Sequence, residues 1–93
     1  MSDIVVTVIA GSWAKNYIDY IDYIDYIDYI DYVDKETVRL TLKSGSDLSG
    51  AIAALGIPPD EIGLAAINGK AAPLETKLCG GDRLSLFPVI VGG

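Results

Sequence analysis

The most informative stretch of the chain is residues 64–88, which read LAAINGKAAPLETKLCGGDRLSLFP. It opens with an apolar run that leads into Asn68-Gly69, the dipeptide best suited to the positive φ angles of a tight hairpin turn. It closes with a glycine-Asp turn at residues 80–82 and with residues 83–87, in which polar and apolar residues alternate as in a half-buried strand. The stretch therefore predicts a short hairpin, a connector and a final strand.

Two strands and one helix are predicted upstream of this stretch. Residues 4–10 (IVVTVIA) form an apolar, β-branched run that is typical of a buried strand, and residues 37–42 alternate as a half-buried strand should. Ser46 or Asp47 can cap a helix that Gly56 ends. The apolar face of that helix comprises Leu48, Ala51, Ile52 and Leu55. This order of elements predicts an α+β fold, a mixed sheet with one helix packed across one face.

The net charge of the chain lies in one segment. Ninety-three residues suit one small domain, so we expect residues 1–93 to fold as a single unit. The formal charge is -6, and residues 17–34 (YIDYIDYIDYIDYIDYVD) hold six Asp and no base, which leaves seven acids facing seven bases elsewhere. With no cluster of Lys and Arg and a repulsive acidic segment, the chain is not expected to bind nucleic acid.

The Tyr-Ile-Asp repeat at residues 17–34 fits neither regular element over its length. On a helix its three stripes wrap around the axis, and on a strand an Asp at every third position puts charge on both faces and should break the pairing. We favour a tandem duplication inserted between the first two strands, mostly disordered or loosely structured. A partner-binding arm is the main alternative, and a cation site is disfavoured because no glycine lets the chain curl around one ion.

The residue types exclude several kinds of chemistry. The chain has no His and a single Cys, so Ser-His-Asp and Cys-His catalysis are excluded and a zinc site lacks ligands. Cys79 fits a reducing compartment and is expected to be a small packing residue, and Asp60-Glu61 should be an exposed first turn. The amino-terminal residues lack the features of a signal peptide or a membrane span. We expect a cytoplasmic protein that binds no metal and is not itself an enzyme.

Residues 64–70 (LAAINGK), the pattern LxxGDRLSLFP at 78–88 and VIVGG at 89–93 together resemble the ubiquitin-like sulfur carriers. This family includes MoaD, the small subunit of molybdopterin synthase, and ThiS, the sulfur carrier of thiamin synthesis. The resemblance covers residues 3–11 and 36–93 and is nearest to MoaD. It implies a β-grasp fold, with the repeat as a long insert between strands 1 and 2.

The resemblance also implies a function for the carboxyl-terminal tail. The carboxylate of Gly93 would be adenylated with ATP by an activating enzyme and converted to a thiocarboxylate, which donates sulfur in molybdopterin or tungstopterin synthesis. The alternatives are a ThiS-type carrier for thiamin thiazole synthesis and a non-reactive β-grasp binding module. The partners implied are the adenylating enzyme and a synthase subunit, either the large subunit of molybdopterin synthase or thiazole synthase. No cofactor is expected on the chain itself, because ATP is used by the partner.

The residues of the tail receive separate roles. Gly92 has no side chain and would let the tail pass through a narrow channel. By resemblance, Val89, Ile90 and Val91 line the opening into the partner. Phe87 and Pro88 set the direction in which the tail leaves. The family often has two prolines after the Phe, and this chain has only Pro88, which leaves the choice between MoaD and ThiS open.

Overall fold

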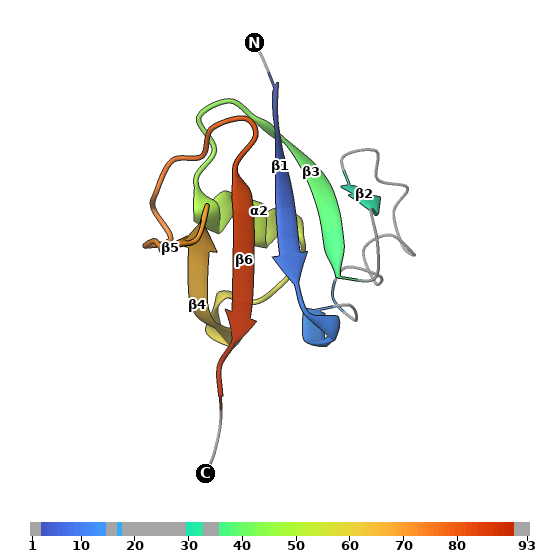
Figure 1. The fold of residues 1–93 in the computed structure, drawn as a ribbon, viewed down its shortest axis with the longest axis vertical. Helices are drawn as coiled ribbons and strands as arrows, with labels where there is room; N and C mark the ends of the chain where they lie inside the picture. The colour runs from blue at the N-terminus through green and yellow to red at the C-terminus, as the bar shows by residue number, and fades with distance from the viewer. Residues whose placement is uncertain (1–2, 15–16, 18–29, 33–35, 91–93) are drawn as a thin grey trace.

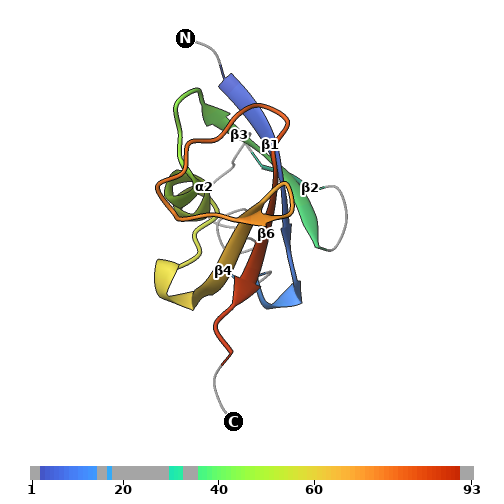
Figure 2. The same ribbon diagram turned by 60° about the vertical axis from the view of Figure 1, so that its left-hand side comes forward.

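The computed structural model describes residues 3–14, 17, 30–32 and 36–90. In this part of the chain a six-stranded sheet in the order β2-β3-β1-β6-β4-β5 carries one α-helix across one face (Figures 1 and 2). The elements are β1 (Asp3–Ala10), η1 (Ser12–Ala14), β2 (Ile30–Tyr32), β3 (Thr37–Lys43), α2 (Leu48–Ala54), η2 (Pro59–Glu61), β4 (Ile62–Ile67), β5 (Lys70–Ala71) and β6 (Arg83–Pro88). Strands β1 and β6 run parallel and the other pairs are antiparallel, which confirms the predicted mixed sheet.

The core lies between α2 and the covered face of the sheet. Its largest fully buried side chains are Leu40, Leu48, Ile52, Leu55, Ile57, Leu84, Val6 and Val8. The predicted apolar face of the helix is therefore confirmed, because all four of its residues are buried. The carboxylate of Asp47 caps α2: its Oδ1 accepts hydrogen bonds from the Ser49 hydroxyl (2.7 Å) and the Gly50 N–H (2.8 Å). These bonds, the one from Ser49 first, hold the pKa of Asp47 below its ordinary value.

Strand β1 is buried on one face only, which corrects the expectation from its continuous apolar run. Val6 and Val8 are buried, whereas Val5 is 47% exposed. The reason is the layer structure: the helix covers one face of the sheet, and the other face has no layer over it in the described part of the chain (Figure 2). An apolar run in a central strand thus places apolar side chains on the open face as well.

The Asn68-Gly69 turn joins β4 to β5 with positive φ angles of 52° and 86°, as predicted. Asn68 also reaches the turn before β6. Its Oδ1 accepts from the Arg83 N–H (2.9 Å), its Nδ2 donates to Asp82 Oδ1 (3.0 Å), and its own N–H donates to the Arg83 carbonyl (2.8 Å). The hairpin and the glycine-Asp turn, which lie more than ten residues apart, are thereby locked together at the start of β6.

The repeat contributes strand β2, which corrects the expectation that its Asp residues break strand pairing. Ile30, Asp31 and Tyr32 are the Cα partners of Leu40, Arg39 and Val38 in an antiparallel ladder. Within these three residues apolar, acidic and apolar residues alternate, which matches the two-residue period of a strand. Residues 18–29 and 33–34 lie outside the described residues, so the interpretation of the repeat as a loose insert stays a prediction for them.

Candidate functional site

The carboxyl-terminal tail leaves the protein at the end of a central strand. Strand β6 lies between β1 and β4, and its end points away from the pole where β1 begins (Figure 1). The N–H of Val89 donates to the carbonyl of Glu61 (3.0 Å), so the tail is tied to the body of the protein up to that residue. Ile90 is 93% exposed. The predicted residues Val91, Gly92 and Gly93 lie outside the described residues.

Gly63 makes room for the tail, and the sequence analysis did not identify it. A Cβ on Gly63 would lie 2.7 Å from the carbonyl oxygen of Pro88 and 3.0 Å from the Cα of Val89, both closer than van der Waals contact allows. The ladder between β4 and β6 is irregular at this point, between Ile62 and Leu64. Gly63 directly precedes the predicted apolar run, and a glycine beside a strand is a signal that could have indicated such a close approach of two backbones.

Two large apolar side chains lie beside the tail on the open face of the sheet. Phe87 is 48% exposed, and its Cα partner Leu64 on β4 is 50% exposed. The structure thus brings the predicted residues Phe87, Pro88 and Val89 together at one pole and adds Leu64, which the sequence analysis missed. Exposed apolar residues that adjoin one another mark contact surfaces for other proteins.

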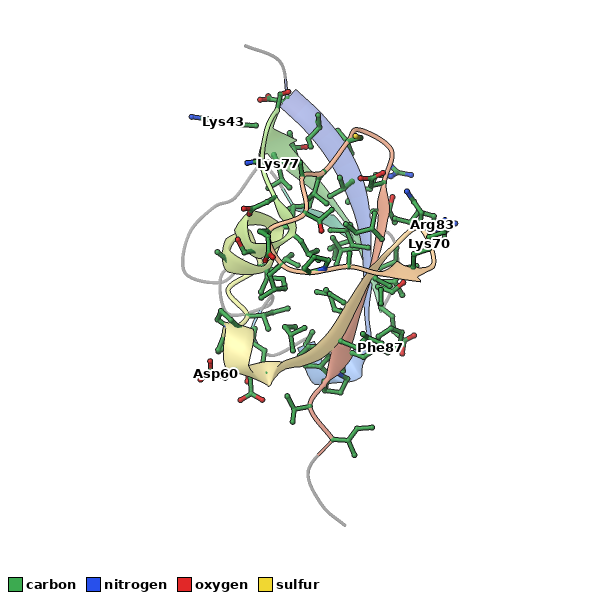
Figure 3. All side chains as sticks on the ribbon, turned by 90° about the vertical axis from the view of Figure 1, so that its left-hand side faces the viewer. Lys43, Asp60, Lys70, Lys77, Arg83 and Phe87 are labelled. Carbon is green, nitrogen blue, oxygen red and sulfur yellow. The ribbon has the colours of Figure 1, made fainter. Side chains whose placement is uncertain are left out.

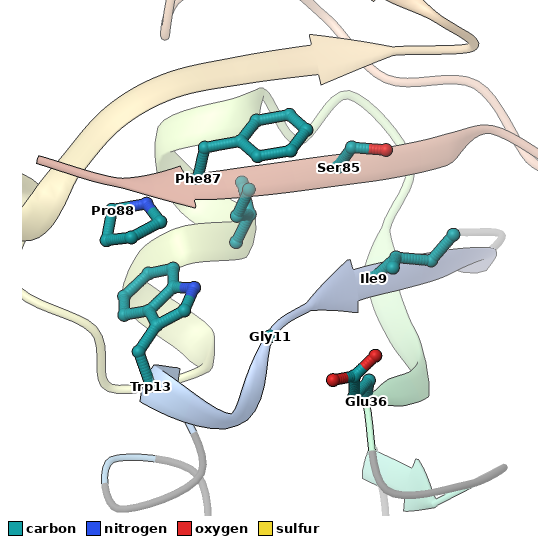
Figure 4. Close-up of a pocket in the computed structure, with 8 residues that line it drawn as sticks. Ile9, Gly11, Trp13, Glu36, Ser85, Phe87 and Pro88 are labelled. Carbon is teal, nitrogen blue, oxygen red and sulfur yellow. The ribbon is translucent and has the colours of Figure 1, made fainter. Parts of the chain in front are cut away.

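A hollow of about 320 Å³ lies between β1 and β6, at the end of β6 from which the tail leaves (Figure 4). Trp13 from η1 lies opposite Pro88 at the end of β6, Ile9 from β1 lies opposite Ser85, and Glu36 also lines the hollow. The lining is mostly apolar, since Glu36 and Ser85 are its only polar side chains. It therefore extends the apolar surface around the tail. Trp13 was not identified from the sequence, where it stands alone in a short polar stretch.

Charged side chains lie on both sides of the molecule. Figure 3 places Lys70 and Arg83 on the side that also carries Phe87, and it places Asp60 on the opposite side together with Lys43 and Lys77. The Asp60-Glu61 pair is exposed in a short 3-10 helix, as predicted.

Cys79 is exposed, so the expectation that it is a small packing residue is wrong. The backbone of Cys79 shapes the turn before β6, because its N–H donates to Asp82 Oδ2 (2.8 Å). Cys79 precedes the start of β6, at the end of that strand away from the tail.

Within the described ranges no group of three or more His, Cys, Asp or Glu can hold a metal ion. None of the helices in those ranges is long and apolar enough to cross a membrane.

The mixed sheet, the single helix and the apolar tail after the last strand define a ubiquitin-like β-grasp protein. The chain belongs to the Mut7-C ubiquitin family, whose model matches residues 25–91. The fold is similar to the crystal structure of SAMP1 from Haloferax volcanii, with a TM-score of 0.63 and 21% identity over 96% of this chain and 99% of that one. A second crystal structure, of the H. volcanii small archaeal modifier protein 1, matches with a TM-score of 0.64 and 20% identity over 94% of this chain and 99% of that one.

These matches confirm the β-grasp fold and the resemblance to ubiquitin-like carriers. No curated protein matches the chain. That the chain is nearer to MoaD than to ThiS stays a prediction. The two solved structures share too little sequence identity with this chain to indicate more than the fold.

Proposed function

We propose that this protein is a ubiquitin-like sulfur carrier whose reactive group is the carboxylate of Gly93. The observation that carries the proposal is the geometry of the tail. A central strand ends beside exposed Phe87 and Leu64, its backbone is tied as far as Val89, and the next residue projects into solvent. A tail that leaves the body of the protein next to an apolar surface can enter a partner's active site while that surface binds the partner.

The proposed chemistry takes place in two steps. A carboxylate oxygen of Gly93 attacks the α-phosphorus of ATP, which forms an acyl-adenylate and expels pyrophosphate. Hydrosulfide then attacks the carbonyl carbon: a C–S bond forms, the C–O bond to AMP breaks, and a proton goes to solvent. The carboxylate needs the first step because its oxygen is a poor leaving group until it is bonded to AMP. The chain acts as a reagent, and the adenylating partner supplies the catalytic groups.

The hydrogen bond from the Val89 N–H to the Glu61 carbonyl sets how far the tail reaches. Residues 90–93 follow Val89, and four extended residues span at most about 13 Å. The active site of the adenylating enzyme should therefore lie about that deep behind the surface that meets Phe87. Ile90 and Val91 would line the opening of this channel, and the two glycines would occupy its narrow part.

We assign the carrier first to molybdopterin or tungstopterin synthesis, with the large synthase subunit as the acceptor of the thiocarboxylate. Thiamin thiazole synthesis, with thiazole synthase as the acceptor, is the second assignment. Attachment to other proteins is a further candidate, because one of the similar structures is titled a small archaeal modifier protein. In that case the same acyl-adenylate, directly or by way of a partner's thiol, would acylate a lysine amine of a target.

Intact mass spectrometry tests the proposal. The full chain would be incubated with ATP, sulfide and a candidate adenylating enzyme. A carrier gains the mass difference between one sulfur and one oxygen, and the change maps to Gly93. The matched control is the same chain with one alanine added after Gly93, which should fold normally and remain unchanged in mass. No mass change with any adenylating enzyme of the source genome would contradict the proposal, and lysine conjugates without a thiocarboxylate would favour the modifier function.

A further inference from the structure

The Asn68-Gly69 turn combines two residues that can react with each other. Both are exposed, and a Cβ built on Gly69 would meet no described residue beyond its chain neighbours within 4 Å. Because glycine has no side chain, nothing shields its backbone nitrogen from the asparagine side chain before it. Asparagine is also one of the thermolabile residues of proteins. The turn therefore joins a reactive side chain to an accessible nucleophile in contact with water.

The reaction open to this pair is intramolecular deamidation. The backbone nitrogen of Gly69 attacks Cγ of Asn68, a C–N bond forms, and the side-chain nitrogen leaves as ammonia with the proton that the backbone nitrogen gives up. The product is a five-membered succinimide. Water then adds to one of its two carbonyl carbons and breaks the bond from that carbon to the ring nitrogen. Cleavage at Cγ gives aspartate at position 68, and cleavage at the main-chain carbonyl gives isoaspartate.

The folded turn opposes the first of these steps. The Nδ2 of Asn68 donates to Asp82 Oδ1 (3.0 Å), and its Oδ1 accepts from the Arg83 N–H (2.9 Å). Departure of ammonia breaks the first bond, and attack at Cγ needs a side chain that is free to approach Gly69. Both bonds hold that side chain on the turn before β6. The reaction therefore proceeds through molecules in which the hairpin has opened locally.

Deamidation replaces a donor in this network by a second carboxylate. The nitrogen that donates to Asp82 Oδ1 becomes an oxygen, so two carboxylates face each other where a hydrogen bond stood. Neither can donate, and like charges repel. In isoaspartate the backbone also gains a methylene group. The two-residue turn between the paired residues Ile67 and Lys70 does not fit that longer backbone.

The attachment of the same turn to β1 does not depend on residue 68. The Thr7 N–H donates to the Asp82 carbonyl (2.9 Å), and the Gly81 N–H donates to the Val5 carbonyl (2.8 Å). These two bonds use main-chain atoms only. A modified chain therefore keeps the turn before β6 on β1 and loses its bonds to the hairpin.

We propose that Asn68 is a site of spontaneous deamidation that local opening of the β4–β5 hairpin admits, and that the product disconnects the hairpin from the start of β6. The change is irreversible because ammonia is lost. It adds a negative charge beside Asp82 and acts on the strand that carries the tail. A chain that has opened at this turn thus acquires a covalent mark. The inference is independent of the chemistry proposed at Gly93.

Peptide mapping by mass spectrometry tests the site. The full chain would be incubated in mildly alkaline buffer, folded and in concentrated urea, and the replacement of the amino group of Asn68 by a hydroxyl group would be followed by mass. We expect conversion in both, at least about tenfold slower in the folded chain. Equal rates would overturn the proposed gating. No conversion in the folded chain over about a hundred half-lives of the denatured chain would overturn the site.

Two variants test whether the bond to Asp82 restrains the reaction. Asp82→Ala frees the Nδ2 of Asn68 and should speed conversion in the folded chain by about threefold or more. The matched control is Asp60→Ala, which removes an exposed carboxylate from η2 and should leave the rate unchanged. A rate for Asp82→Ala equal to that of the parent chain would overturn the gating by this bond.

Hydrogen exchange of Asn68→Asp tests the product, because this variant reproduces one outcome of the reaction. The amides of residues 68 and 83 should exchange at least about tenfold faster than in the parent chain. The amides of Thr7 and Gly81 should stay within about threefold of it, since their bonds use main-chain atoms. Unchanged exchange at residues 68 and 83 would overturn the proposed consequence.

An exchange of residue types tests the cause. In the double variant Asn68→Asp with Asp82→Asn, the amide at position 82 can donate to the carboxylate at position 68. Its oxygen can accept from the Cys79 N–H, as Asp82 Oδ2 does in the parent chain (2.8 Å). The double variant should therefore regain the protection of the parent chain at residues 68 and 83. If protection stayed at the level of Asn68→Asp alone, the facing carboxylates would not be the cause, and the proposal would be overturned.

Discussion

Strands β6 and β2 belong to one sheet but are specified in different ways. Strand β6 lies between two neighbours, and both Leu84 and Leu86 are buried, so a shift of its register would expose them and bury Arg83 or Ser85. Strand β2 is three residues long, lies at the edge of the sheet and has β3 as its sheet neighbour. The comparison teaches that buried side chains and neighbours on both sides fix the strand that carries the tail, whereas β2 is held by its pairing with one strand in the described part of the sheet.

The largest expected effect comes from truncation of a buried side chain in β6. Leu84 is fully buried, and Leu84→Ala should lower the free energy of unfolding by about 2–5 kcal/mol. Ile30→Ala in β2 should lower it by less than about 1 kcal/mol, because β2 is a three-residue strand at the edge of the sheet. Urea unfolding followed by the fluorescence of Trp13 measures both. Equal losses for the two variants would contradict the difference between the strands.

The next effect concerns the start of the tail. Gly63→Ala forces the new methyl group against the backbone of Pro88 and Val89 and should cost about 1–3 kcal/mol. It should also slow formation of the Gly93 thiocarboxylate, since the direction of the tail changes. The control is Gly80→Ala, whose Cβ would meet Ile4 at an ordinary 3.8 Å. Unchanged loading in a destabilised Gly63→Ala chain would separate the role of Gly63 in stability from any role in the direction of the tail.

A smaller effect is expected at the turn that anchors the beginning of β6. Asn68→Ala removes the side-chain hydrogen bonds to Asp82 and Arg83 and places alanine at a φ of 52°, which together should cost about 1–2 kcal/mol. Asn68→Gly removes the same hydrogen bonds but accepts that φ angle. Equilibrium unfolding of the two variants divides the loss between the hydrogen bonds and the backbone. If both variants were as stable as the parent chain, the network would not anchor β6.

The smallest effect is expected at the helix cap and depends on pH. The folded-state pKa of Asp47 is lowered, so its ionised form stabilises the fold above the unfolded-state pKa of about 3.9. This contribution is lost as the pH falls through the folded-state value. Asp47→Asn should therefore flatten part of the acid limb of a plot of melting temperature against pH and lower the melting temperature slightly at pH 7. An acid limb identical to that of the parent chain would contradict this assignment.

The reliable predictions from the sequence are those that depend on local backbone chemistry. Asn68-Gly69 adopts the two positive φ angles that its residue types favour, Asp47 caps the helix, and the helix buries the face that its spacing predicts. The predictions that failed depend on neighbours distant in sequence. The apolar run of β1 was expected to be buried throughout, because residue type does not reveal which face of the sheet the helix leaves open. Cys79 was expected to be a small packing residue, but it lies in the exposed turn before β6.

The amino-acid sequence by itself therefore determined where strands alternate, which residues form the turns, and which tail we propose as the functional group of the protein. Tertiary structure decided that Gly63 must be small, that Leu64 and Trp13 join Phe87 around the tail, and that residues 30–32 of the repeat join the sheet. The physical reason is the range of the interactions involved. Turns and caps are set within a few residues, whereas the approach of two backbones and the exposure of a face depend on elements that meet only after the chain has folded.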